Sequence, residues 1–115
     1  MNIIKHRNNW PWGHSTIIII EGGKGTVTVS FDKEFEDEAT ITSLSVHESA
    51  RKKGLGTELI KLAEEEAKEF GVNKIVLFAD EESFTYDWYQ RLGYEPAFDR
   101  IYIDSPQIKE LAKNV

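Results

Sequence analysis

The sequence predicts an α/β or α+β fold, with a mixed central β-sheet and flanking helices. Two observations predict it. Two β-branched runs flank a glycine-rich turn, which is typical of a β-hairpin, and later a strand, a leucine-faced helix and a second strand follow one another. A strand–helix–strand unit implies a crossover between parallel strands, so the sheet is expected to be mixed. Since 115 residues is close to the commonest domain size, residues 1–115 are expected to form one domain.

The first elements are predicted from the segment STIIIIEGGKGTVTVSF. Thr16–Glu21 and Thr26–Phe31 are the β-branched runs, and GGKG between them supplies residues that can take positive φ. A third strand is predicted over Ala39–Val46, where apolar and polar residues alternate. Because the alternation breaks in the second half of this run, we expect a β-bulge near Ser43–Ser45.

A helix is predicted over Gly54–Phe70, because leucines and alanines recur on one face and charged residues lie opposite. Gly71 should end this helix, as a residue that tolerates the left-handed conformation. The short apolar run NKIVLFA then predicts a strand that is covered on both faces.

The last third of the chain predicts a second helix in SFTYDWYQRL, with Ser83 as its N-cap and Gly93 as its stop. Phe84 and Trp88 on this helix are interpreted as core residues. RIYID predicts a final strand. SPQIKELAKN predicts a short terminal helix, with Ser105 as N-cap and Pro106 in its first position.

Composition limits the function. The net charge is −6, which argues against a nucleic-acid binder and suits a neutral or cationic partner. There are no cysteines, and His6, His14 and His47 lack metal-ligand spacing, so no metal site is predicted. Neither a membrane-spanning run nor the long apolar stretch of a signal peptide is visible, and a cytoplasmic location is expected.

Two other segments allow two interpretations each. Asp32–Glu38 holds five acids and one lysine, and is either a solvated loop or an acidic rim that attracts an amine. Trp10 and Trp12 flank Pro11, and their indoles either cover the sheet or contact an acceptor or a second subunit. The sequence alone leaves both pairs of interpretations open.

The segment RKKGLGT, at the start of the first predicted helix, can bind an anion. A helix N-terminus presents unpaired N–H groups and a partial positive charge. Glycines let an anion approach the backbone, a threonine adds a hydroxyl, and three cations precede them. The residues of this predicted anion site are Arg51, Lys52, Lys53, Gly54, Leu55, Gly56 and Thr57.

This segment resembles the GNAT family of N-acetyltransferases. RKKGLG matches the signature [QR]-x-x-G-x-[GA], and LSVHESARKKGLGTELI is similar to that family's acetyl-CoA-binding segment. Downstream, WYQRLGYEP resembles the family segment Y-x-x-x-G-[FY], with Tyr89, Gly93 and Tyr94 in register. The resemblance extends over about residues 39–103 and implies a GNAT-like fold with acetyl-CoA as co-substrate.

The resemblance also implies roles for individual residues. Backbone groups of Leu44, Ser45 and Val46 would pair with the pantetheine arm, and the amides of Arg51–Thr57 would hold the pyrophosphate. The bulged strand would splay from its parallel neighbour, leaving a gap for the thioester, whose carbonyl a backbone N–H near Val46 would polarise.

Two positions at the second helix complete the implied site. Tyr89 aligns with the tyrosine that protonates the departing thiolate, and its ordinary pKa of about 10 keeps it protonated at neutral pH. Glu82 and Ser83 are the candidates for the position where the family often has an asparagine that contacts the coenzyme arm, and Ser83 either binds the coenzyme or only caps the helix.

The predicted function is acetyl transfer from acetyl-CoA to a primary amine, by direct attack in a ternary complex. The alternative is a non-catalytic acetyl-CoA-binding or protein-interaction module with the same fold. The general base is left unassigned among Glu34, Glu36, Glu38, His47 and Thr42 acting through a water.

The N-terminal segment departs from the family. The family usually has a strand and two helices before the hairpin, where this chain has only MNIIKHRNNWPWGH. The acceptor site would then be open, built by this segment or completed by a partner subunit, which favours a homodimer.

Overall fold

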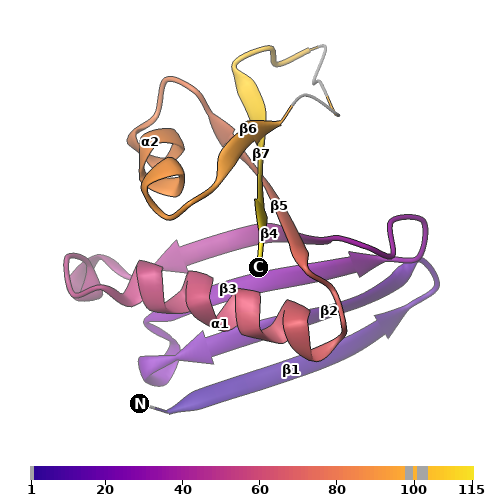
Figure 1. Ribbon diagram of the computed structural model, residues 1–115. Helices are drawn as coiled ribbons and strands as arrows, with labels where there is room; N and C mark the ends of the chain where they lie inside the picture. Colours follow the sequence, from indigo (N-terminus) through magenta and orange to yellow (C-terminus); the bar gives the residue numbers. More distant parts are fainter. Residues whose placement is uncertain (1, 98–99, 101–103) are drawn as a thin grey trace.

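The computed structural model describes residues 2–97, 100 and 104–115. Among these residues, seven strands form one mixed sheet in the order β1-β2-β3-β4-β5-β7-β6, accompanied by two α-helices (Figure 1). The predicted fold class is therefore confirmed. The strands are β1 (Ile3–Trp10), β2 (Gly13–Ile20), β3 (Gly25–Asp32), β4 (Ala39–Val46), β5 (Lys74–Asp80), β6 (Glu95–Ala97) and β7 (Ile108–Asn114), and the helices are α1 (Leu55–Glu69) and α2 (Phe84–Arg91).

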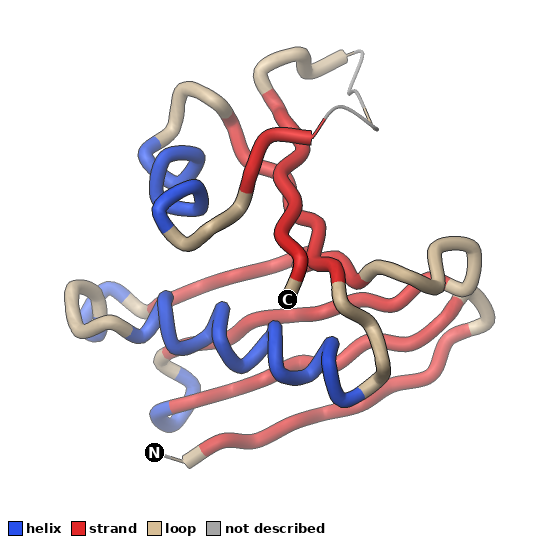
Figure 2. The backbone as a smooth tube through the Cα atoms, viewed as in Figure 1, coloured by secondary structure: helices blue, strands red, loops and turns tan. Residues whose placement is uncertain are grey.

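The larger layer is an antiparallel sheet of β1–β4 with α1 lying across one face (Figure 2). Alternate residues of β2 and β3 point toward α1 and are fully buried, as the period of two along a strand requires. The leucine and alanine face of α1 packs against them. This core includes Ile18, Ile20, Val27, Val29, Leu59, Ala63 and Ala67.

The bulge in β4 lies at Thr42. Thr28 of β3 pairs with Ser43, whereas Val29 pairs with Ile41, so Thr42 is the extra residue. This position directly precedes the range in which the sequence predicted a bulge. An extra residue bends its strand and disturbs the ladder locally.

β4 and β5 are parallel neighbours for only two residue pairs. Ala39 pairs with Ile75 and Thr40 with Val76, and the described ladder goes no further. β5 and β7 then turn away from the layer of β1–β4, as Figure 1 shows. Beyond Thr40, the edge of β4 that would face β5 therefore lacks a strand partner within the described part of the chain.

A buried carboxylate joins β1 to α1. The side chain of Glu66 is fully buried and accepts hydrogen bonds from Lys5 Nζ (3.0 Å), Arg7 Nε (2.9 Å) and Thr16 Oγ1 (2.7 Å). Burial by itself would raise the pKa of Glu66, but the hydrogen bonds from Arg7, Thr16 and Lys5 outweigh it and lower the pKa to about 2. Glu66 is thus charged at neutral pH and acts as a structural acceptor.

The C-terminal prediction was wrong. The segment after Ser105 and Pro106 forms the strand β7, which pairs with β5 from Asn114–Lys74 to Ile108–Asp80, in place of the predicted helix. Its glutamate, leucine, alanine and lysines are good helix formers, but pairing with β5 satisfies its backbone and buries Leu111 completely. The strand predicted in RIYID falls largely on residues 101–103, outside the described residues.

Two further strands were not predicted. β6 is short and pairs with β7. β1 is exposed along its whole length and carries a polar sequence with no clear alternation, so its strand character comes from pairing with β2 and from the ion pairs to Glu66. Pro11 and Trp12 alone join β1 to β2, and the two helices that the family usually carries before its hairpin do not occur here.

Neither described helix is long and apolar enough to cross a membrane.

Candidate functional site

A pocket of about 660 Å³ opens at the N-terminus of α1. Its walls come from the end of β4, the turn that follows, the first turn of α1 and the start of α2. The lining residues are Leu44, Ser45, Val46, Ala50, Arg51, Lys52, Gly54, Leu55, Gly56, Thr57, Phe84, Thr85 and Trp88. All predicted coenzyme-binding residues except Lys53 and Ser83 belong to this set.

The turn before α1 has the backbone geometry of a tight anion-binding loop. Gly54 is the N-cap of α1 and takes φ = 77°, a left-handed conformation that glycine adopts without strain. Lys52 also has a positive φ of 65°. The next residues begin the helix, and the first N–H groups of a helix have no partner within it. Gly54–Thr57 therefore present unpaired donors at the pocket wall.

Gly56 in the first turn of α1 faces the indole of Trp88 in α2. A Cβ atom built on Gly56 would lie 3.3 Å from Cη2 and Cζ2 of Trp88. A larger side chain here would displace the indole or fill the pocket. Glycine thus keeps the approach to the helix N-terminus open.

The pocket continues onto the free edge of β4. Leu44, Ser45 and Val46 all lie beyond Thr40, where β4 has parted from β5. The N–H and C=O groups on this edge can pair with an extended ligand as a neighbouring strand would. The geometry suits a ligand with an anionic head and an extended arm that carries amide groups.

Tyr89 is not part of the pocket lining, but it packs against Trp88, which is. It is almost fully buried, and its ring packs against Trp88 (centroids 5.1 Å apart) and Tyr94 (6.1 Å). Burial raises the pKa of the Tyr89 hydroxyl, so the group is protonated at neutral pH. Tyr94 is also buried, and its hydroxyl donates to Glu64 Oε2 (2.9 Å).

Ser83 occupies the N-cap position of α2, as predicted, but its side chain does not cap the helix. Its hydroxyl donates to the Asp80 carbonyl (2.7 Å) and lies 2.7 Å from Thr85 Oγ1. The hydroxyl is therefore already engaged within the loop before α2.

The candidate bases have different surroundings. Glu38 is buried and forms ion pairs with Arg100 and Lys74, so two cations already balance its negative charge. His47 directly follows β4, and its Nδ1 accepts the N–H of Ser49 (3.2 Å). Thr42 is exposed at the bulge, beside the gap between β4 and β5.

The sequence did not predict four lining residues. Phe84, Thr85 and Trp88 reach the pocket because α2 packs beside the start of α1, and Ala50 reaches it from the turn between β4 and α1. Phe84 was interpreted as core, but its side chain is 76% exposed. Its place in the sequence could have indicated this, because Phe84 directly follows the predicted N-cap Ser83 and so begins α2, at the end of the helix that lines the pocket.

Comparisons with known proteins place the chain in a family. The family model described as "Acetyltransferase (GNAT) family" matches residues 4–94. None of the curated proteins that were compared with the chain matches it.

Among solved structures, IAA acetyltransferase from Bacillus cereus has a TM-score of 0.72 at 17% identity, covering 99% of this chain and 100% of its own. An acetyltransferase from Bacillus subtilis in complex with CoA has a TM-score of 0.71 at 16% identity, covering 99% of each chain. A further Bacillus cereus acetyltransferase has a TM-score of 0.67 at 26% identity, covering 88% of this chain and 71% of its own. With a family model matching most of its length, the chain belongs to the GNAT acetyltransferase family.

Proposed function

We propose that this protein is an acetyl-CoA-dependent N-acetyltransferase that acts on a primary amine. The observation that carries the proposal is the continuity of the pocket, which leads from unpaired amides at the start of α1 onto the free edge of β4. Coenzyme A combines an anionic pyrophosphate with an amide-containing arm, and so matches both halves of this surface. The CoA complex of the similar Bacillus subtilis structure supports the same ligand.

In the proposed complex, the amides of Arg51–Thr57 bind the pyrophosphate. Leu44, Ser45 and Val46 pair through their backbones with the pantetheine arm. The thioester then reaches the gap between β4 and β5, where the N–H near Val46 polarises its carbonyl.

The reaction is a direct transfer in a ternary complex. The amine nitrogen attacks the thioester carbonyl carbon, a C–N bond forms, the C–S bond breaks and the thiolate leaves. Tyr89 donates its hydroxyl proton to that thiolate, and a base or water takes the proton lost by the amine. For this step the Tyr89 hydroxyl must reach the sulfur.

The proposed acceptor is a cationic amine, because the protein carries a net charge of −6 and a concentrated acidic loop. We also propose a cytoplasmic homodimer. β1 is an exposed edge strand with an unpaired outer side, which can pair with a second copy.

Incubation with acetyl-CoA and a panel of amines should release free CoA thiol with at least one amine. The panel comprises polyamines, amino acids, aminoglycosides and lysine peptides, and the release is measured with a thiol reagent. Acetyl-CoA alone should raise the melting temperature, because it binds only the folded state.

A raised melting temperature without turnover on any amine would favour the non-catalytic coenzyme-binding module. The feature that favours this alternative is the two-residue connection between β1 and β2, because it replaces the helices that usually shape the acceptor site in the family.

Gly56→Leu should weaken coenzyme A binding about tenfold, equivalent to ~1.4 kcal/mol. The leucine must displace Trp88 or occupy the pocket, since even a Cβ would lie 3.3 Å from the indole. Titration calorimetry with CoA measures the loss, and thermal unfolding checks the fold. Gly56→Ala is the graded control and should have a smaller effect. Unchanged affinity in the leucine variant would rule out the proposed coenzyme pocket.

A further inference from the structure

Three side chains from distant parts of the chain meet beside Tyr89, and we call them the Glu64 cluster. Glu64 lies in the middle of α1, Tyr94 directly precedes β6, and Lys113 lies near the end of β7. The Tyr94 hydroxyl donates to Glu64 Oε2 at 2.9 Å, and Lys113 Nζ donates to the same oxygen at 3.1 Å. One carboxylate therefore joins α1, the turn after α2 and β7.

The turn between α2 and β6 places Tyr94 against Tyr89. Gly93 takes φ = 99°, a value that glycine adopts without strain, and so lets the chain turn between the two tyrosines. The Tyr94 N–H donates to the Tyr89 carbonyl at 3.1 Å, and the two rings meet edge to face with their centroids 6.1 Å apart. Tyr94 is thus joined to Tyr89 both through the backbone and through the ring.

The bond from Tyr94 to Glu64 is shielded from water and has a charged acceptor. Tyr94 is fully buried, and the Glu64 side chain is only 14% exposed. A hydrogen bond to a charged group is roughly twice as strong as a neutral one. Burial and the neighbouring Glu64 charge raise the pKa of Tyr94, so its hydroxyl keeps its proton on the bond to Glu64. Tyr94 is therefore a fixed donor and not a proton source for the reaction.

The Tyr94 hydroxyl does more than packing requires. A phenylalanine at this position would fill nearly the same space and keep the ring contact with Tyr89. The hydroxyl adds a directional bond to α1, the helix whose N-terminus lines the coenzyme pocket. Lys113 fixes the other partner of this bond, since its Nζ contacts Glu64 and lies 5.6 Å from the centroid of the Tyr94 ring. The cluster thus ties the ring beside Tyr89 to the element that would hold the coenzyme.

We propose that Glu64 is a positioning residue for acetyl transfer. Through the Tyr94 hydroxyl it fixes the ring of Tyr89 relative to α1, and so aims the Tyr89 hydroxyl at the leaving sulfur. This inference rests on the proposed function, in which Tyr89 is the proton donor. Position matters to such a step, because a misplacement of about 1 Å can lower a rate about a hundredfold.

Tyr94→Phe should lower kcat about tenfold and change the KM for acetyl-CoA by less than about twofold. In a Tyr89→Phe background the same substitution should have no further effect, because the hydroxyl that it would misplace is absent. Rates are measured at a temperature at which thermal unfolding shows every variant to be folded. Equal losses in both backgrounds would make the role of Tyr94 purely structural, and a Tyr94→Phe enzyme at the wild-type rate would also overturn the proposal.

Glu64→Ala should reproduce the loss of kcat seen for Tyr94→Phe. Glu64→Gln should keep most of the wild-type rate, because its amide oxygen still accepts the Tyr94 proton. Glu65→Ala is the matched control, since it removes the neighbouring carboxylate from the exposed side of α1. If Glu64→Ala is as fast as Glu65→Ala, Glu64 has no part in positioning.

NMR spectra of ¹³C-labelled tyrosine rings separate this inference from the proposed function. In Glu64→Ala the ring signal of Tyr89 should shift or broaden, and that of Tyr86, nearly one turn earlier in α2, should change much less. An enzyme that acetylates an amine but is insensitive to Tyr94→Phe overturns this inference and leaves the proposed function intact. If the wild type acetylates no amine, the proposed function fails and the ring signals decide alone. An unchanged Tyr89 signal would then show that Glu64 does not fix this ring.

Discussion

Tyr89→Phe should lower kcat about a hundredfold while leaving the affinity for acetyl-CoA nearly unchanged. The hydroxyl is the only part removed, and it lies outside the lining of the coenzyme pocket. Without a proton donor the thiolate must leave as an anion or take its proton from water. Because burial raises the pKa of Tyr89, the wild-type donor stays protonated through neutral pH, and activity should not fall there from loss of this proton.

Steady-state kinetics and CoA calorimetry on the same preparations test this. Tyr86→Phe is the matched control, since Tyr86 is a second, partly buried tyrosine of α2 and has no proposed role. It should keep full activity. A Tyr89→Phe enzyme that works at the wild-type rate would remove Tyr89 from the mechanism, and one that loses CoA affinity would make its role structural.

Glu66→Ala should destabilise the fold by about 1–3 kcal/mol, the usual cost of leaving a buried donor without its partner, because Thr16 is buried whereas Lys5 and Arg7 are partly exposed. The variant leaves Lys5, Arg7 and Thr16 without their shared acceptor and leaves a cavity beneath β1. Urea unfolding measures the change. Glu65→Ala is the control, because it makes the same substitution on the exposed side of α1. Equal stabilities of the two variants would show that the Glu66 contacts contribute nothing net.

The same group predicts a dependence of stability on pH. The pKa of Glu66 is about 2 in the folded protein, against an ordinary value of 4.5. Because the pKa of Glu66 is lower in the folded protein than in the unfolded chain, its charged form stabilises the fold at pH values above 4.5. This contribution, about 3 kcal/mol, disappears as the pH falls from 4.5 toward 2. Glu66→Gln should therefore flatten the loss of stability over that interval. An unchanged slope would mean that other carboxylates produce it.

Local patterns predicted the middle of the chain and failed at its ends. The strands from Thr16 to Val46 and the helix α1 carry their periodicity in contiguous residues. β7 has the residues of a helix and becomes a strand only because β5 lies beside it. β1 has no clear pattern of apolar residues. It is held by its pairing with β2 and by the ion pair of Lys5 with Glu66, which is sixty-one residues away in the sequence. Contacts of that range leave little local signal.

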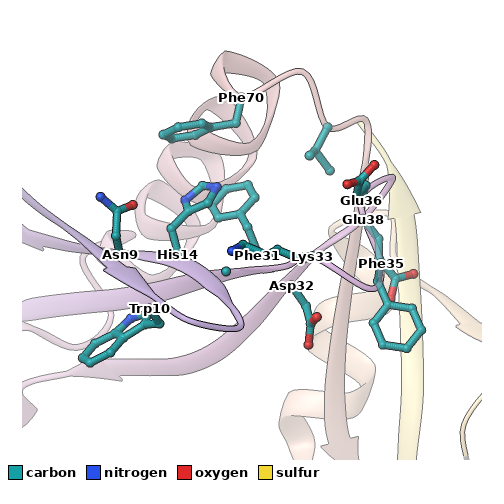
Figure 3. A pocket seen from close by; sticks show the side chains of 12 residues that line it. Asn9, Trp10, His14, Phe31, Asp32, Lys33, Phe35, Glu36, Glu38 and Phe70 are labelled. Atoms are coloured by element: carbon teal, nitrogen blue, oxygen red, sulfur yellow. The ribbon is translucent and has the colours of Figure 1, made fainter.

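The residues of the candidate site likewise divide into those with a local sequence signal and those brought in by tertiary contacts. Glycines and cations before α1 form a local signal, so Gly54 and Gly56 were found together with their neighbours. Phe84 and Trp88 line the pocket because α2 packs near Gly56, which is a tertiary contact. The pocket at the C-terminal end of α1 (Figure 3) forms where the ends of β1, β2 and β3 meet that helix, so only Trp10 and the acidic loop stood out in the sequence.

The ion pairs of β1 have a consequence for how the protein can change. β1 supplies Asn9 and Trp10 to the pocket at the C-terminal end of α1 and no residue to the coenzyme pocket. Its attachment to α1 depends on charge, whereas the coenzyme side rests on the apolar core of β2–β4 and α1. Substitutions in β1 can therefore alter the surface around Asn9 and Trp10 while the residues that line the coenzyme pocket are preserved.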